Sequence, residues 1–591
     1  MAGLSTDPGL GSTLASQLRW AISLTLLVNA ASMLTPVVSA GDSVTYAALA
    51  QHIANTDDWV DLVLDGQDWL DKPHFPFWAT ALFFKIGGVN AFSYILPGYL
   101  FHLLGAYFTY RMARLFDGRT TALLALLVYV SVYHLMQSAS EVKAEAYLTG
   151  SIMAACYYWL RYDAQARLKY LLLGALFTAL AVMSKGVFTL ITIASGLVCM
   201  WLYQKQGAKL WRPKWLLAVA VSALLTAPEL IALYLQFDAH PDKRVFGHTG
   251  VSGIRFFLWD SQFGRFWNTG PIQNHNGSPL YFLHVFLWAF LPWVAVFVAA
   301  LWSGMRRFSS GSVRERSGFV FLCGTFFVTF ALFSATRFQL DHYTVILFPF
   351  AALVCARHLA HWLQQPCHPS CNRLVVAQLG VTLLVLSLAL GLSVYVAQAA
   401  LVFLVLALLC ILLAYGWWMR QHARVHTVLL YPVFAINLLY VFLELMHLSA
   451  YTHYSIPYNA SQLLAHNPDW PIYVYQMNPV ITRELALYSR APCQGVSDPS
   501  QLPATARPYW MVLRQTQLAQ VRSVLGPLRP VAQRNWAPDK TGILPRMLRL
   551  AKGVEPLEAI AIVQVGTLPY PTRPEALGRT PQAAHPSKPP A

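Results

Sequence analysis

The chain has 591 residues, of which 56% are hydrophobic and only 12% are charged. Soluble domains carry about a quarter charged residues, so this composition excludes a soluble globular protein and predicts a polytopic α-helical membrane protein. The net charge of +16 comes from Lys and Arg residues that recur in the short connections between apolar segments. This pattern is typical of cytoplasmic loops, so the charge gives no reason to expect nucleic acid as a partner.

About thirteen apolar segments have a length suited to crossing a bilayer, which takes about 20 residues in a helix. They cover approximately residues 20–40, 91–112, 121–138, 146–160, 170–183, 187–203, 215–235, 280–302, 318–335, 343–360, 374–396, 401–418 and 427–448. Alternate connections carry the Lys/Arg excess, which predicts a cytoplasmic N-terminus. The odd number of spans then predicts a periplasmic C-terminus. We therefore expect a transmembrane domain over residues 1–450, with large outside loops at about residues 41–90 and 236–279.

The first outside loop is rich in acids and aromatics, from GDSVTYAALA at its start to DKPHFPFW at its end. After Asp42, apolar residues recur with helical spacing at Tyr46, Leu49 and Ile53. This spacing predicts a short amphipathic helix on the bilayer surface. Asp42 would be either the N-cap of that helix, a role that Asp often fills, or a functional carboxylate near the lipid boundary.

Three cations on the outer side depart from the charge bias: Lys72, Lys185 and Arg337. A single such cation often anchors a lipid headgroup, whereas three beside an acid-rich loop favour a phosphate-binding site. Glu145 lies at the outer end of the fourth apolar segment, where a carboxylate is costly unless it is paired or hydrated. It is either a functional acid or one half of a simple ion pair, with Lys143 or with a neighbouring loop.

The composition changes after about residue 451, where short apolar strands alternate with helical patterns. This alternation predicts a small α/β domain over residues 451–566 on the outer side. Residues 567–591 are rich in Pro and have little to bury, which predicts a disordered tail. The expected strands cover residues 472–476, 509–514 and 559–565, and the expected helices residues 481–489 and 515–525.

Several motifs follow one another over about the first 350 residues: the two ends of the first loop, VKAEAYL, MSKG, GRFWNTG with SPLYFLHVFLWAFLPW, and ATRFQLDHYTVILFPF. In this order they resemble the polyprenyl-phosphate-dependent membrane glycosyltransferases of the GT-C class. The resemblance is to the group that contains bacterial aminoarabinose transferases and protein O-mannosyltransferases. Motifs in the same order are far more specific than any single one.

The resemblance implies that Asp42 is the catalytic acid of the first loop and Glu145 the second acidic position. It also implies a set of contacts to the donor phosphate, with His342 nearby. Those contacts are Lys72, Lys185, Arg337 and Tyr343.

Members of the group can hold a divalent metal such as zinc between an acid before the loop lysine and a histidine of the later large loop. Here these residues would be Asp71 and His275. From the residues alone, the histidine spacing matches no tight metal signature, and ordinary loop histidines are favoured. The chain departs from the aminoarabinose transferases at Ser43, Thr45 and Asp71, where Glu, Arg and Glu are typical. These departures bear on the sugar and the acceptor more than on the reaction class.

The function that the resemblance implies is transfer of a sugar from a polyprenyl-phosphate donor, undecaprenyl phosphate in bacteria. The acceptor would be a lipid such as lipid A, a glycan or a protein on the periplasmic side of the bacterial inner membrane. The alternative is a transporter or lipid flippase, which would place charges near mid-span and show repeated halves. A non-catalytic scaffold would leave the acid and lysine pair of the first loop unexplained.

Overall fold

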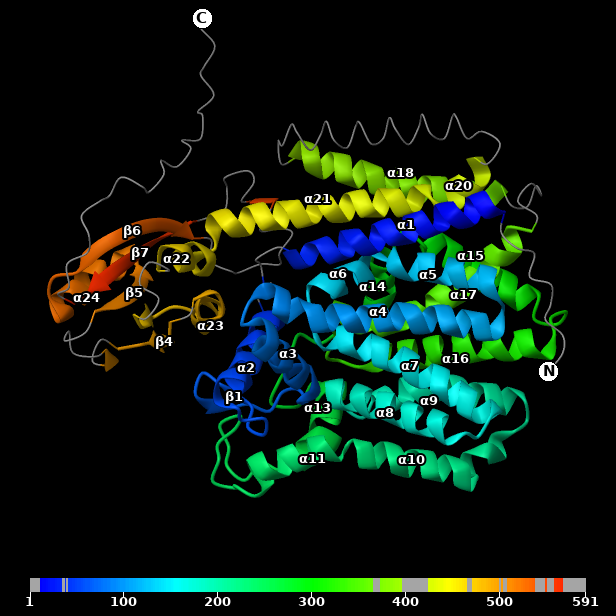
Figure 1. The fold of residues 1–591 in the computed structure, drawn as a ribbon, viewed down its shortest axis with the longest axis horizontal. Coiled ribbons are helices and arrows are strands. Elements are labelled where there is room, and N and C mark those ends of the chain that lie inside the picture. The colour runs from blue at the N-terminus through cyan, green and yellow to red at the C-terminus, as the bar shows by residue number, and fades with distance from the viewer. Residues whose placement is uncertain are drawn as a thin grey trace, which may run out of the picture.

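The structure is a computed structural model, which describes residues 11–34, 38, 41–364, 372–395, 423–464, 470–489, 491–498, 501–502, 508–536, 548–549 and 557–566. Long helices lie side by side along the longest axis of the molecule (Figure 1). A small sheet, α2, α3 and the β1 hairpin gather at one end of this bundle (Figure 1). The predicted span at residues 401–418 and the predicted tail at residues 567–591 lie outside the described residues.

The bundle is built from long apolar helices, several of which are broken into two parts. In chain order they are α1 (Ser12–Ala31), α4 (Ala91–Phe116), α5 (Arg119–Val130), α6 (Tyr133–Ser140), α7 (Ala144–Ala164), α8 (Leu168–Lys185), α9 (Thr189–Tyr203), α10 (Pro213–Leu225), α11 (Ala227–Leu233), α14 (Tyr281–Ala289), α15 (Val294–Arg306), α16 (Val313–Ala335), α17 (Phe348–Trp362), α18 (Asn372–Tyr395), α20 (Ala423–Leu429) and α21 (Tyr431–Tyr454).

By length and composition, five helices within the described residues could cross a membrane, or up to eight if each of three bent pairs is one span. This supports a polytopic helical membrane fold, while the number of thirteen spans stays a prediction. The first span was expected at residues 20–40, but α1 already begins at Ser12 and ends at Ala31. The expected start was wrong because a helix can begin with polar residues, which an apolar run does not show. The expected end was wrong because the apolar run in the sequence continues past Ala31 towards Pro36, and helical backbone is disfavoured before a proline.

Three expected spans are bent rather than straight, and the breaks of two of them meet inside the bundle. The angle between α5 and α6 is 62°, and that between α14 and α15 is 111°. Pro292 lies in the second break and has no backbone N–H to continue a helix. The backbone N–H of Tyr133 donates to the carbonyl of Leu291 at 2.9 Å, and Trp293 Nε1 donates to Ser131 Oγ at 3.0 Å. Polar groups at each break therefore form hydrogen bonds with groups at the other break, and polar groups inside a membrane need such partners within the protein.

The first large loop contains the predicted amphipathic helix, α2 (Asp42–Thr56). One face of α2 is buried, including Tyr46, Leu49 and Ile53, which confirms the expected apolar stripe. The loop continues through a hairpin and a second helix. The elements are β1 (Val63–Leu64), β2 (Gln67–Asp68) and α3 (Phe75–Gly87), and the second large loop adds α12 (Gly253–Arg255) and α13 (Ser261–Trp267).

A five-stranded mixed sheet forms the C-terminal part, in the order β4-β3-β5-β7-β6. β3 pairs in parallel with β4 and β5, and β7 pairs antiparallel with β5 and β6. The helix α23 packs on α2, where Gln51 Nε2 donates to the carbonyl of Ala486 at 2.9 Å. The elements are α22 (Ile456–Leu464), β3 (Ile472–Tyr475), α23 (Pro479–Tyr488), β4 (Cys493–Val496), β5 (Tyr509–Arg514), α24 (Leu518–Leu525), β6 (Arg529–Trp536) and β7 (Glu558–Val565).

Candidate active site

A buried ion pair lies at the end of the bundle that carries α2. Glu145 is the second residue of α7 and Lys185 the last of α8, and the Lys185 Nζ contacts Glu145 Oε1. Their side chains are only 3% and 9% exposed. The Lys185 Nζ also lies 3.9 Å from the ring centroid of Tyr343, a cation–π distance. The alternative pairing of Glu145 with Lys143 is wrong, because Lys143 Nζ lies 3.9 Å from Glu141 Oε2.

Two glycines allow the backbone approaches that place this pair. Gly150 of α7 lies so close to α4 that a Cβ there would come within 2.3 Å of the Phe101 carbonyl oxygen. Small residues of this kind let helices in membranes approach closely. Gly186 follows Lys185 with a φ of +108°, which a side chain would strain. The chain can therefore turn directly after Lys185 and leave its ammonium group facing α7.

His342 also lies beside Glu145. Its Nε2 lies 3.7 Å from Glu145 Oε1, and its Nδ1 lies 3.2 Å from Asp341 Oδ1. Both residues belong to a short 3₁₀ helix, Asp341–Leu347, which leads into α17. Lys185 and His342 thus meet at one carboxylate, and Tyr343 contacts both of them.

A second charged cluster lies in the first loop around Asp71. Lys72 Nζ is 2.7 Å from Asp71 Oδ2, while Arg265 Nη2 contacts Asp71 Oδ1 and donates to the Asp71 carbonyl at 3.0 Å. Burial raises the pKa of Asp71, but the charges and hydrogen bonds of Lys72 and Arg265 lower it further, so the net pKa is below its ordinary value. Asp71 is therefore a carboxylate at neutral pH that holds two cations.

Arg265 was not singled out from the sequence, although it is the only cation of the motif GRFWNTG. That motif was expected in the second large loop, and nothing in its local pattern shows which residue of the first loop it reaches. The signal that could have identified it is a lone cation within a motif of the resembling family.

Tyr46 of α2 lies within the influence of Asp42 and of the Asp71 cluster. Its side chain is buried, and burial raises the pKa of its hydroxyl well above the ordinary value. The negative charges of Asp42 and Asp71 raise this pKa further, and Arg265 lowers it. The same three charges act on Tyr343, which contacts Lys185. Asp42, the Asp71 cluster and the Lys185 pair therefore share one region.

Asp42 is exposed and is the first residue of α2, whereas the N-cap position belongs to Gly41. The expectation that Asp42 could act as the N-cap is therefore wrong. Its carboxylate has no hydrogen bond or ion pair with any residue that the structure describes. Next to it, Ser43 Oγ and the Tyr94 hydroxyl both donate to the carbonyl of Val142, at 3.3 and 2.8 Å. These bonds hold the start of α2 beside the segment that leads to Glu145.

Arg337 joins the site through its backbone. Its N–H donates to the carbonyl of Phe266 at 2.9 Å, and its carbonyl accepts from the N–H of Gly277 at 2.7 Å. The side chain is exposed, with its guanidinium carbon 5.9 Å from the centre of the Trp267 ring. The arginine therefore borders the loop that carries Arg265 but contacts neither charged cluster.

The expected metal site between Asp71 and His275 finds no support in this arrangement. Both carboxylate oxygens of Asp71 contact cations, and His275 is exposed. Within the described parts of the chain, no three His, Cys, Asp or Glu side chains are grouped as ligands of a metal ion would be. This donor set does not fit a divalent cation, so no step below involves one.

A buried pair that the sequence analysis missed fixes the motif DKPHFPFW. His74 Nδ1 lies 3.0 Å from Glu229 Oε1, and its Nε2 lies 3.0 Å from the carbonyl oxygen of Val60. Both charged side chains are fully buried. Burial lowers the pKa of His74, but Glu229 and the Val60 carbonyl raise it more, so the net pKa lies above its ordinary value. The pair anchors the loop beside Lys72 to α11.

Comparisons with known proteins find relatives over part of the chain. The profile of the dolichyl-phosphate-mannose-protein mannosyltransferase family matches residues 71–231. The undecaprenyl phosphate-α-4-amino-4-deoxy-L-arabinose arabinosyl transferase of Enterobacter sp. (strain 638) is 25% identical over 333 residues, 55% of this chain and 56% of its own. Its counterpart in Pseudomonas aeruginosa (strain UCBPP-PA14) is 26% identical over 323 residues, 53% and 54% of the two chains. The chain thus spans about half the length of the curated relatives that it matches.

Solved structures extend the similarity to nearly the whole chain. The crystal structure of ArnT from Cupriavidus metallidurans bound to undecaprenyl phosphate superposes with a TM-score of 0.70 and 18% identity, covering 93% of this chain and 98% of that one. The apo form gives a TM-score of 0.68 over the same shares. The chain therefore shares the fold of a membrane glycosyltransferase of the GT-C class, as the motifs predicted.

Proposed function

We propose that this protein is a membrane glycosyltransferase that moves a sugar from a polyprenyl-phosphate donor to an acceptor in the cell envelope. The observation that carries the proposal is the clustering of Glu145, Lys185 and Tyr343 beside the Asp71, Lys72 and Arg265 cluster. The relatives named above use undecaprenyl phosphate linked to 4-amino-4-deoxy-L-arabinose. We accordingly propose undecaprenyl phosphate as the carrier and a lipid A-like lipid as the first acceptor to test.

The position of the charges along the helices supports an enzyme over a transporter. Glu145 is near the start of α7 and Lys185 is at the end of α8, so both lie where helices leave the bundle. A transporter would place such charges near the middle of its spans. Charges at a helix end can instead meet a substrate whose headgroup lies at the membrane surface.

The cations would bind the phosphate of the donor and stabilise it as it leaves. When the bond between the anomeric carbon and the phosphate oxygen breaks, the electron pair goes to that oxygen and the phosphate gains a negative charge. Lys72, Lys185 and Arg265 would oppose this charge in a partly dehydrated site, an effect worth a few kcal/mol. Asp71 and Glu145 hold these cations in place until the donor phosphate arrives.

Asp42 would act on the acceptor. Because its carboxylate is exposed and has no partner among the described residues, it is available to take the proton of an acceptor hydroxyl. The acceptor oxygen would then form the new bond to the anomeric carbon, while polyprenyl phosphate departs. A positioned carboxylate in this role contributes roughly two to four orders of magnitude in rate.

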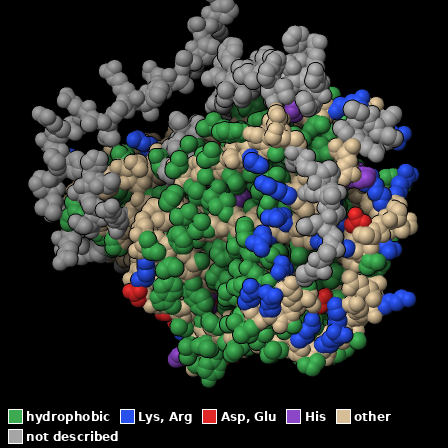
Figure 2. Space-filling view, turned by 45° about the vertical axis from the view of Figure 1, so that its right-hand side comes forward, with side chains coloured by type: hydrophobic (Ala, Val, Ile, Leu, Met, Phe, Trp, Pro, Cys, Tyr) green, Lys and Arg blue, Asp and Glu red, His purple; other side chains and the backbone are tan. Residues whose placement is uncertain are grey.

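The direction of insertion follows from the charges at the two ends of the bundle. Exposed Lys and Arg residues gather on the face that comes forward in Figure 2, at the end of the bundle remote from α2 (Figure 1). We therefore propose a bacterial inner-membrane protein with this end in the cytoplasm and the site in the periplasm. Residues 451–566 would form a separate periplasmic domain on the transmembrane domain of residues 1–450. The cationic residues are Arg114, Arg119, Arg167, Lys169, Lys205, Arg212, Arg306, Arg307 and Arg314.

The test is a transfer assay with the purified full chain in lipid nanodiscs and a polyprenyl-phosphate sugar. Release of polyprenyl phosphate and modification of the acceptor should both be measured by mass spectrometry. Lys72→Ala and Lys185→Ala should each raise the donor concentration needed for half-maximal rate, because each removes a cation from the phosphate site. Lys209→Ala serves as the matched control, since Lys209 pairs with Asp163 at the opposite end of the bundle. Equal losses in all three variants would contradict the assignment of the phosphate site.

A further inference from the structure

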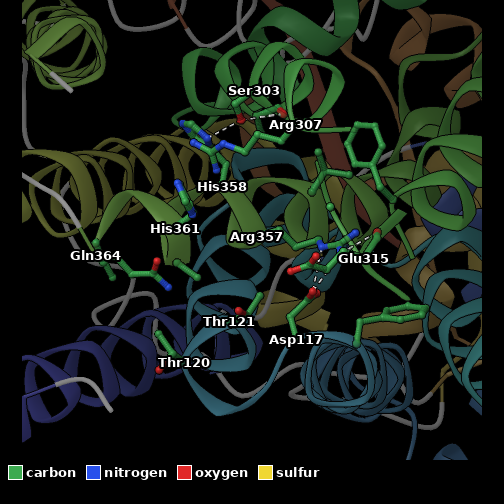
Figure 3. A pocket seen from close by; sticks show the side chains of 18 of the residues that line it. Asp117, Thr120, Thr121, Ser303, Arg307, Glu315, Arg357, His358, His361 and Gln364 are labelled. Atoms are coloured by element: carbon green, nitrogen blue, oxygen red, sulfur yellow. Dashed lines mark hydrogen bonds and ion pairs between the residues drawn. The ribbon is translucent and has the colours of Figure 1, made fainter. Parts of the chain in front are cut away.

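A cavity lies at the end of the bundle remote from the candidate active site, and the proposed reaction does not use it. It measures about 890 Å³ and lies among the ends of α4, α5, α15, α16 and α17. Figure 3 shows polar side chains that line it, with Arg357 directed towards Asp117 and His358 towards Ser303. The helix α4 has 26 residues and is about 39 Å long at 1.5 Å per residue. This length separates the cavity wall at Asp117 from the end of α4 near the candidate active site.

The lining of this cavity carries more positive than negative charge. Its only carboxylates among the described residues are Asp117 and Glu315, and each of them already has a partner within the protein. Asp117 Oδ1 lies 3.0 Å from Arg357 Nη2, while Glu315 forms a capping box with Ser312 at the start of α16. Arg307, Arg314 and Arg316 also line the cavity, so cations outnumber carboxylates among its described lining residues.

Buried donors around the cavity also lack partners. Arg316 Nε and Arg357 Nη1 are shielded from solvent and have no hydrogen-bond acceptor among the described residues. An unpaired buried donor of a charged group costs free energy, and an anion nearby would reduce this cost. The arginines thus indicate a ligand that brings negative charge.

Neutral polar groups line the same space. Ser303 lies in the last turn of α15 and Arg307 directly follows this helix, and Ser303 Oγ is 2.7 Å from His358 Nδ1. His361 and Thr121 complete this wall (Figure 3). Hydroxyl and guanidinium groups in one place suit the several oxygens of a phosphate group.

The cavity also has an apolar side and lies at the depth of a membrane interface. Phe116, Phe308 and Phe319 line it. Beside it, the Arg306 guanidinium lies 4.6 Å from the ring centre of Trp302, which is 57% exposed. Exposed Trp and Arg residues mark the boundary between the hydrocarbon and the headgroups. A ligand with a phosphate and adjoining acyl chains would match both sides of the cavity.

We propose that this cavity binds the phosphorylated headgroup of an anionic phospholipid from the leaflet opposite the candidate active site. This site is distinct from the donor site, and its assignment does not depend on the proposed transfer reaction. A phosphate monoester headgroup, as in phosphatidic acid, offers the highest charge to Arg307 and Arg316.

The test is native mass spectrometry of the delipidated full chain titrated with phosphatidic acid or with phosphatidylcholine of the same acyl chains. Wild-type protein should retain one phosphatidic acid more tightly than phosphatidylcholine. Arg307→Gln should weaken this binding about fivefold, the effect of one cation near an anionic headgroup, and Arg316→Gln should act in the same direction. Arg307→Lys should retain most of the affinity, because it keeps the charge.

Arg306→Gln is the matched control, since Arg306 neighbours Arg307 in the chain but does not line the cavity. Thermal unfolding of each variant shows whether it is folded, and exposed Arg307 should tolerate replacement. Equal affinity for the two lipids, or equal losses for Arg306→Gln and Arg307→Gln, would overturn the proposal. Displacement of the lipid by inorganic phosphate at the same concentration would identify a soluble phosphate as the ligand, and would also overturn it. Because the readout is lipid binding, failure here leaves the transfer assay unaffected.

Discussion

Lys185 ends α8 with its ammonium group against the carboxylate of Glu145, at the second position of α7. Neither charge could stay at this depth alone, because a buried charge without a partner is expensive. The pair therefore fixes the relative position of two helix ends and at the same time holds a cation ready for an incoming phosphate.

Lys185→Ala should destabilise the protein by about 3–5 kcal/mol, because it leaves Glu145 buried and unpaired. The double variant Glu145→Gln/Lys185→Ala should recover much of this loss, while the raised donor concentration needed for half-maximal rate persists. Thermal unfolding and the transfer assay, run on the same preparations, separate the two effects. If activity returns together with stability, the pair is structural and the phosphate site lies elsewhere.

Arg265→Gln should weaken the donor site without unfolding the bundle. The variant removes one of the two cations on Asp71, so the pKa of Asp71 should rise towards its ordinary value. Donor affinity should fall by about one order of magnitude, as expected for the loss of a charge-assisted contact of about 1.5 kcal/mol. Arg255→Gln is a suitable control, because Arg255 belongs to the same loop, pairs with Asp260 and is 74% exposed. Unchanged donor affinity in Arg265→Gln would contradict this role.

The pair of His74 and Glu229 should make stability depend on pH. The pKa of His74 lies above its ordinary value of 6.5, so the folded state binds its proton more tightly than the unfolded state. The stabilisation is complete below about pH 6.5 and is lost as the pH rises through the raised pKa. Melting temperatures measured from about pH 5.5 to 9.5 should therefore fall more steeply for wild-type protein than for His74→Gln. Parallel curves would show that His74 is not protonated in the folded protein.

Arg483 joins the C-terminal sheet to the active-site loop. Its Nε lies 3.1 Å from Asp65 Oδ1, and its Nη1 donates to Thr45 Oγ1 at 3.3 Å, one helical turn from Asp42. Asp65 is partly exposed, so this contact should be worth about 0.2–1 kcal/mol. Arg483→Ala should raise the rate of limited proteolysis between the bundle and the sheet by a few-fold, whereas Arg522→Ala, on exposed α24, should not. Equal cleavage of both variants would show that Arg483 does not hold the domain.

Much of this arrangement could be predicted where a local pattern carries the information. The apolar spacing after Asp42 predicted α2, and short apolar runs placed strands that overlap β3, β5 and β7. Glu145 and Lys185 could be singled out because a charged side chain beside an apolar segment is costly unless it has a partner or a function. In these cases the helix, the strand or the functional charge is specified by a few residues that are neighbours in the chain.

The remainder depends on partners that are far apart in the chain. The pairs of Asp71 with Arg265 and of His74 with Glu229 each join segments separated by more than 150 residues. Nothing in either segment specifies the other, so only the packed structure shows the pairing. The bend between α14 and α15 was missed for a similar reason: an apolar run keeps the same composition whether it is straight or broken, and Pro292 is the only local sign.

Asp42 provides the sharpest test of the proposed mechanism. Because Gly41 occupies the N-cap, Asp42→Asn leaves the capping of α2 unchanged and removes only a favourable interaction of about 0.3–1 kcal/mol with the helix dipole. The substitution keeps the size of the side chain but removes its charge and its basicity. Asp57→Asn is the matched control, since Asp57 lies at the other end of the same helix and its side chain is 74% exposed.

If Asp42 takes the proton of the acceptor, Asp42→Asn should lower the transfer rate by roughly two to four orders of magnitude. Donor binding should change little, because Asp42 contacts none of the cations that would hold the phosphate. The rate should be measured at saturating donor, so that a loss of donor affinity cannot mimic a loss of catalysis. Asp57→Asn should transfer at close to the wild-type rate. If Asp42→Asn also does so, the acceptor is activated by another group, and Glu145 beside His342 becomes the carboxylate to replace next.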